Sequence, residues 1–146
     1  MAAIRNPDSV RPWQHVLEPL RGYLMLARAL VEGGHAFAEG WNFGPSLDGA
    51  VSVRQLVSRM TSAWPSVQAA IAPEENAPRE AQLLRLDNTK ARERLGWRPS
   101  LTLDDTVSFT VEWYRAVHER PSCAAEMMHK QLNDYERQVA GAGTRL

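Results

Sequence analysis

Several features that would assign a protein to a class at once are scarce in this 146-residue sequence. It has one cysteine, Cys123, so it can form no internal disulfide, and this suits a reducing compartment. Lysine plus arginine number 17 and aspartate plus glutamate also number 17, so no excess positive charge favours nucleic acid or an anionic membrane surface. No apolar run approaches the roughly 18 residues of a membrane span, and the first residues lack the apolar core of a signal peptide. These absences predict a cytoplasmic protein that binds neither nucleic acid nor membrane.

The glycine patterns that hold dinucleotides, GxGxxG and GxxGxxG, are also missing. In such turns glycine is needed because a Cβ would keep the pyrophosphate away from the helix N-terminus. We therefore expect no cofactor-binding residue in this chain, and we also assign it no catalytic residue and no metal site.

The most organised stretch runs from Arg11 to Val31 and predicts a helix from about Glu18 to Glu32. Pro19 is tolerated only in a first helical turn, and Gly33 begins a glycine pair that favours a helix end. Apolar residues surround most of this helix, so we expect it to be buried over most of its circumference. The polar residues form one narrow stripe: Glu18, Arg21, Arg28 and Glu32.

The remaining pattern predicts a helix-rich α/β chain with a few short strands and no complete Rossmann sheet. The expected strands are 2–6, 41–43, 67–71 and 82–86, and the expected helices begin after Ser52, Asp87, Thr102 and Pro121. Ser52 with Gln55 and Thr102 with Asp105 have the spacing of capping boxes. We divide the chain into residues 1–121, a ligand-binding portion, and residues 122–146, a C-terminal docking helix with a frayed tail.

Four sequence phrases resemble a known family. They are IRNP, RPWQHVLEPLRGY, NFGP and RLDNTKARERLGWRP, and together they are similar to the C-terminal part of the sugar-nucleotide dehydratases and epimerases. These enzymes belong to the extended short-chain dehydrogenase/reductase family, and the full second phrase resembles above all its 4,6-dehydratases for CDP-sugars. The resemblance spans nearly the whole chain but only the C-terminal part of a family member.

The resemblance implies which residues bind a CDP-sugar. Arg11 would face the nucleotide phosphates, for which a guanidinium is a bidentate partner, and Glu80 would accept from the ribose hydroxyls. Arg79 would contact phosphate or base, although family members carry histidine there. Arg5 and Trp13, on the same basic and aromatic approach to the helix, complete the expected substrate-binding set.

Each of these assignments has a plainer alternative. Arg5 and Arg11 also fit two exposed surface arginines, and residues 73–80 also fit an exposed loop with ordinary charges. His15 is better explained as a hydrogen-bonded histidine at a buried strand end than as a catalytic group.

The family's acid/base pair, a tyrosine followed four residues later by lysine, is absent. Residues at that spacing from the three tyrosines are Ala27, His118 and Val139. The resemblance therefore implies a substrate-binding fragment, inactive alone, of a lyase that uses NAD in deoxysugar and polysaccharide biosynthesis. Its expected partners are a CDP-sugar and the missing N-terminal half, and the intact enzyme is expected to be a homo-oligomer.

Three alternatives stay open at this point. The chain also fits a fragment of another sugar-nucleotide epimerase or dehydratase, or a non-catalytic nucleotide-sugar binding module. A nucleic-acid binder is disfavoured by the zero net charge. Met1 fits either a natural start or a truncation.

Overall fold

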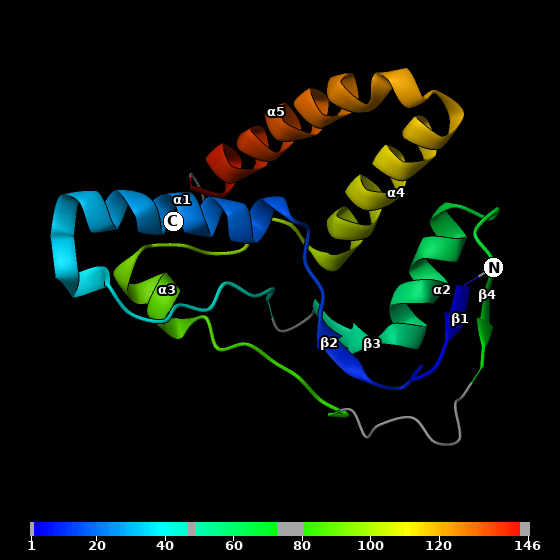
Figure 1. Cartoon of the computed structure of the whole chain (residues 1–146), viewed down its shortest axis with the longest axis horizontal. Coiled ribbons are helices and arrows are strands. Elements are labelled where there is room, and N and C mark those ends of the chain that lie inside the picture. The colour runs from blue at the N-terminus through cyan, green and yellow to red at the C-terminus, as the bar shows by residue number, and fades with distance from the viewer. Residues whose placement is uncertain (1, 47–48, 73–80, 144–146) are drawn as a thin grey trace.

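A computed structural model of the chain describes residues 2–46, 49–72 and 81–143, and within them helices dominate (Figure 1). The elements in order are β1 (Ala2–Ile4), β2 (Val10–Pro12), α1 (Leu17–Gly33), the 3-10 helix η1 (Gly34–Phe37), β3 (Ala50–Ser52), α2 (Val53–Ala63), β4 (Ala69–Ile71), α3 (Thr89–Arg94), α4 (Leu103–Glu119), the 3-10 helix η3 (Pro121–Cys123) and α5 (Ala124–Gly143). The strands have three residues each and form two separate pairs. The prediction of a helix-rich α/β chain without a complete Rossmann sheet is confirmed for the described residues.

The two strand pairs join segments that are far apart in the sequence. β1 pairs with β4 in parallel, and β2 pairs with β3 antiparallel, with Arg11 opposite Val51. On its other side, Val10 makes a parallel bridge to Leu83. β2 therefore lies between β3 and the segment that follows residue 80.

Two of the predicted strands were wrong. Residues 41–43 are not a strand, because the next residue, Gly44, exchanges hydrogen bonds with the side chain of Asn88 in place of a ladder. The strand expected at 82–86 is reduced to the single bridge at Leu83. Short apolar runs satisfy several backbone geometries equally well, so their type depends on which partner reaches them.

Both predicted capping boxes are confirmed. Ser52 Oγ accepts from the Gln55 amide at 3.2 Å, and Thr102 Oγ1 accepts from the Asp105 amide at 3.1 Å, with the reciprocal bonds also present. α3 differs slightly, because Asn88 is its N-cap residue, although the Asp87 carboxylate accepts from the Thr89 amide at 2.8 Å. These bonds span at most three residues, which is why the sequence predicts them well.

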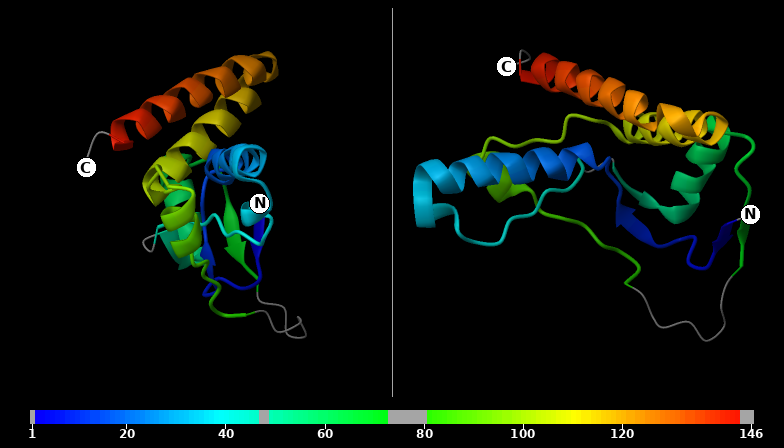
Figure 2. Two further views of the ribbon diagram at one scale, coloured as in Figure 1. Left: turned by 90° about the vertical axis from the view of Figure 1, so that its left-hand side faces the viewer. Right: turned by 45° about the horizontal axis from the view of Figure 1, so that its top comes forward.

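The buried apolar side chains of the described residues form three clusters, one of which joins α2 to α4. α2 lies against α4, where Leu56, Met60 and Trp64 cover the buried face of Leu103, Val107 and Val111. α4 and α5 form a helical hairpin, and α5 turns back toward α1 (Figure 2). No helix in the described ranges is long and apolar enough to cross a membrane.

Glu18 is the point where α1, α5 and the segment after α3 meet. Its carboxylate is 1% exposed and accepts from the amides of Ser100 and Leu101, both at 2.7 Å, and from the Tyr135 hydroxyl at 3.0 Å. The Glu18 carbonyl also accepts from Trp97 Nε1, whose indole is fully buried. Four donors thus stabilise one buried acidic residue.

The prediction that α1 is buried over most of its circumference is wrong. Its buried residues are Glu18 and Gly22, and Glu18 belongs to the narrow stripe of polar residues. The large exposed apolar residues of α1 are Leu20, Tyr23, Leu24, Leu30 and Val31. We call these five residues the outer face of α1. The described residues cover this apolar side only in part, for example where Tyr23 contacts Phe43.

Candidate functional site

The residues expected to bind a sugar nucleotide lie on and beside β2, which leads directly into α1 (Figure 1). β2 is held on both sides: Val10 donates to the Gln82 carbonyl at 2.8 Å and accepts from the Leu84 amide at 3.1 Å, while β3 pairs with its other edge. This anchoring fixes the position of Arg11 in the middle of the strand.

Arg11 is half-buried, and its guanidinium reaches across to the segment that follows the loop of residues 73–80. Nη1 donates to the Ala81 carbonyl at 2.7 Å and to the Val10 carbonyl at 2.8 Å. Ala81 directly follows Glu80 in the chain. The structure thus brings Arg11 to the described end of the segment in which the ribose contact was predicted.

Trp13 has a structural role that the sequence does not reveal. Its Nε1 donates to the Val51 carbonyl at 3.0 Å, and its ring packs against the cluster of Leu103, Val107 and Val111. These contacts tie the end of β2 to β3 and α4. A ligand contact by Trp13 stays a prediction.

The roles of the other three predicted residues, Arg5, Arg79 and Glu80, stay predictions. Arg5 is exposed and follows β1 directly. Arg79 and Glu80 lie outside the described residues, so their roles also stay predictions.

Gln14 and His15 lie between β2 and α1, and neither was among the residues predicted to contact a ligand. Gln14 Nε2 donates to the Phe43 carbonyl at 2.7 Å, while its Oε1 is buried and has no partner among the described residues. His15 is buried, stands edge-on to Phe109 and accepts at Nδ1 from the Leu17 amide at 3.4 Å. The interpretation of His15 as a hydrogen-bonded histidine in a buried position is confirmed.

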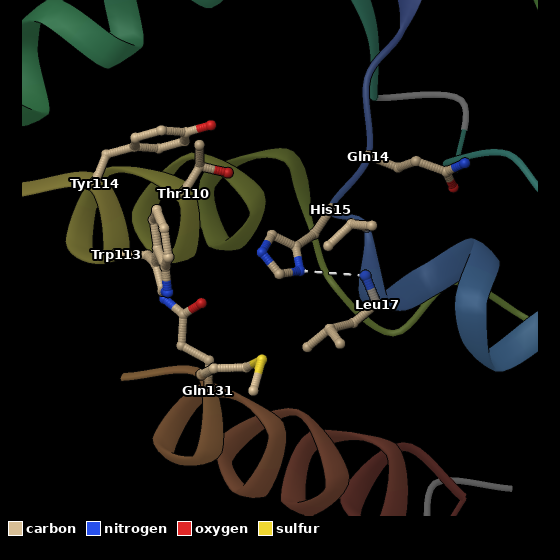
Figure 3. Close-up of a pocket in the computed structure, with 9 residues that line it drawn as sticks. Gln14, His15, Leu17, Thr110, Trp113, Tyr114 and Gln131 are labelled. Atoms are coloured by element: carbon tan, nitrogen blue, oxygen red, sulfur yellow. Dashed lines mark hydrogen bonds between the residues drawn. The ribbon is translucent and has the colours of Figure 1, made fainter. Parts of the chain in front are cut away.

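His15 and neighbouring side chains of α4 and α5 line a cavity (Figure 3). Burial lowers the pKa of His15, so the ring is neutral near pH 7. Thr110 and Gln131, which complete the walls, come from positions about 95 and 116 residues further along the chain than His15. No local sequence signal connects residues so far apart.

The described residues do not fit NAD. Neither strand-to-helix junction, from β2 to α1 or from β3 to α2, contains a glycine that would let a pyrophosphate approach. At α2, the Ser52 side chain already accepts from an N-terminal amide of the helix. The described residues also contain no group of histidine, cysteine, aspartate and glutamate side chains arranged to hold a metal ion.

Comparison with known proteins identifies two relatives, although no family model matches the sequence. Over 113 residues, 77% of this chain, the sequence is 46% identical to CDP-glucose 4,6-dehydratase of Salmonella typhimurium, and the match covers 32% of that relative. Over 89 residues, 60% of this chain, it is 37% identical to UDP-glucose 4-epimerase of Mycolicibacterium smegmatis, covering 28% of that relative. The chain spans about a third of the length of the curated relatives it matches.

Over most of its own length, the chain is related to the extended short-chain dehydrogenase/reductase family, and the resemblance carried by its motifs is confirmed. Both relatives are named for reactions of a nucleotide-linked glucose. Within this family, the longer and more similar match is to CDP-glucose 4,6-dehydratase.

Proposed function

We propose that this chain is the C-terminal, CDP-sugar-binding part of a CDP-glucose 4,6-dehydratase, which converts CDP-glucose to CDP-4-keto-6-deoxyglucose and water. The 46% identity over 113 residues carries this proposal. In the intact enzyme NAD would bind to the part of the enzyme that lies outside the match with this chain, because the described residues of this chain do not fit NAD.

The position of Arg11 supports a role in phosphate binding. Its strand is held on both edges, so the guanidinium is preorganised, and a preorganised arginine loses less entropy when it grips a pyrophosphate. Two of its acceptors are the neutral carbonyls of Val10 and Ala81, and a phosphate would offer the guanidinium stronger, charge-assisted hydrogen bonds than these carbonyls do. In this proposal Arg11 and Arg5 bind the phosphates, Arg79 binds phosphate or base, and Glu80 binds the ribose. Trp13 lies beside them.

The outer face of α1 supports a partner for this chain. Leu24 and Val31 are 73% and 87% exposed there, and contiguous exposed apolar surface of this kind marks an interface. We propose that the N-terminal catalytic half of the enzyme covers it. The part of the relatives that this chain does not match would supply that half.

Titration of CDP-glucose against the chain joined to the N-terminal half of its dehydratase relative tests this function. Arg11→Ala and Glu80→Ala should each lose a charge-assisted contact that contributes about 1.5 to 3 kcal/mol, which is roughly tenfold to over a hundredfold in affinity. Arg11→Lys keeps the charge without the bidentate fork and should lie between wild type and alanine. Arg28→Ala is the control, because Arg28 is exposed on α1 and pairs with Glu32. Wild-type affinity in all four variants would refute the assigned site.

The similarity to UDP-glucose 4-epimerase favours a second candidate, the corresponding part of an epimerase. Parallel titrations with CDP-glucose and UDP-glucose separate the two, since tighter binding of UDP-glucose would favour the epimerase. The isolated chain should neither retain NAD nor convert CDP-glucose to a 4-keto sugar. Turnover by the isolated chain would overturn the assignment of catalysis to a second half, whereas tight binding without a catalytic partner would favour a non-catalytic module.

A further inference from the structure

A cavity of about 390 Å³ lies between the start of α1, α4 and α5 (Figure 3). The side chains that line it are Gln14, His15, Val16, Leu17, Thr110, Trp113, Tyr114, Met128 and Gln131. None of them is acidic, and none is lysine or arginine. Its size and mainly apolar walls, with a few polar groups among them, are typical of small-molecule sites.

His15 presents a hydrogen-bond donor to this cavity. The side chain is 9% exposed, and its Nδ1 accepts from the Leu17 amide, so the neutral ring carries its proton on Nε2. Figure 3 shows Nε2 turned away from Leu17 and into the space between α4 and α5. No described residue accepts a hydrogen bond from Nε2.

Gln131 presents an acceptor to the same cavity. It is 5% exposed, and its Nε2 donates to the Phe109 carbonyl at 2.6 Å, which fixes which end of the amide is nitrogen. The Oε1 of Gln131 is turned from α5 toward the side on which His15 lies (Figure 3). No described residue donates to this oxygen, so it can accept a hydrogen bond from a ligand in the cavity.

The remaining walls determine the shape and charge of a fitting ligand. Trp113 and Tyr114 are in edge contact, with ring centroids 5.2 Å apart, and Met128 is exposed at the rim. Aromatic rings and a thioether pack well against another flat ring. A charged ligand would lose its hydration without gaining an opposite charge, so this cavity disfavours ions.

We propose that the cavity binds a small, uncharged ring that carries a lactam group. The lactam carbonyl accepts from Nε2–H of His15, and the lactam N–H donates to Oε1 of Gln131. The ring packs between Trp113, Tyr114 and Leu17. This site is separate from Arg11 and does not depend on the proposed sugar-nucleotide function.

Titration of the isotopically labelled chain with 2-pyridone, followed by NMR, tests the proposal. The indole N–H of Trp113 and the amide of Gln131 should shift with saturation. Methylation of the ring nitrogen, in 1-methyl-2-pyridone, removes one neutral hydrogen bond and should weaken binding by about three- to tenfold. Toluene, which keeps only the ring, should bind more weakly still.

Matched variants locate the binding. His15→Phe keeps a flat ring beside Phe109 and should weaken 2-pyridone binding by about three- to tenfold, since one neutral donor is lost. Tyr114→Ala, at the exposed rim, should also weaken it, whereas Val31→Ala on the outer face of α1 should leave affinity unchanged. Equal binding of toluene and 2-pyridone, or wild-type affinity in a folded His15→Phe protein, would overturn the proposal. If His15→Phe does not fold, the ligand comparison on the wild-type chain decides alone.

Discussion

The two faces of α1 have opposite surroundings, although they belong to one helix. On the inner face, the charged Glu18 is 1% exposed, while on the outer face the apolar Leu24 is 73% exposed. Glu18 is buried because the amides of Ser100 and Leu101 and the Tyr135 hydroxyl satisfy its oxygens. Leu24 is exposed because no described element reaches it. Burial in this helix follows the available partners more closely than it follows hydropathy.

This difference separates two kinds of stabilisation. The inner face is stabilised by specific, long-range hydrogen bonds that already exist in the chain. The outer face has apolar area that can stabilise the protein only when something covers it. The following predictions test this contrast, from the largest expected effect to the smallest.

Glu18→Ala should cause the largest loss of stability. It would leave the amides of Ser100 and Leu101 and the Tyr135 hydroxyl without their acceptor, so we expect the unfolding free energy to fall by about 3 to 5 kcal/mol. Urea denaturation followed by circular dichroism measures the change. The matched control is Arg28→Ala on the same helix, which removes only an exposed ion pair. Similar losses in both variants would contradict the contrast.

Alkaline pH should weaken the same junction through Tyr135. Burial, and then the negative charge of Glu18, raise the pKa of Tyr135 to about 12 from its ordinary 10.0. Below pH 10 both states hold the proton, whereas between pH 10 and 12 only the unfolded state releases it. Stability should therefore fall over this window by about 2 to 3 kcal/mol. Urea denaturation at several pH values measures the slope.

Tyr135→Phe supplies the control for this pH effect. It lacks the titrating hydroxyl, so it should be less stable than wild type at pH 8 but lose less stability between pH 10 and 12. Parallel curves for the two proteins would show that other groups cause the alkaline loss.

Gly22→Ala should destabilise the protein even though alanine favours helices. A Cβ at Gly22 would lie 2.5 Å from Cδ1 of Phe43, so Phe43 and its neighbour Trp97 must move, at a cost of about 1 to 3 kcal/mol. Gly141→Ala in α5 is the counterpart, because a Cβ there meets nothing within 4 Å. Helix propensity alone should make that variant more stable by up to about 1 kcal/mol. Thermal melts of both variants check the predicted difference in sign.

Leu24→Ser should have the smallest effect on folding. Because Leu24 is already exposed, unfolding free energy should change by less than about 0.5 kcal/mol. The same change should reduce self-association of the isolated chain, as seen by sedimentation velocity, since it removes apolar surface. A loss of stability as large as that of Glu18→Ala would mean that the outer face is already covered within the chain.

The candidate site was predictable in part. The phrase around Arg11 and Trp13 indicated the family, and the comparisons confirm it. The indole bond from Trp13 to Val51 was not predictable, because β3 lies 38 residues further along and has no strong strand signal. The cavity beside His15 was missed for the same reason, since its other walls come from α4 and α5.

The sequence by itself determined the features that depend on near neighbours: the helix ends, the capping boxes at Ser52 and Thr102, and the motifs that indicate the family. Bonds across three residues form wherever the local residues allow them. Only the tertiary structure decided which face of α1 is buried, because the partners of the Glu18 carboxylate are 82 to 117 residues away. The helical pattern of apolar residues shows how apolar each face is, but it does not show which face another element covers. A carboxylate whose oxygens are hydrogen-bonded can therefore be buried while leucines of the same helix stay exposed.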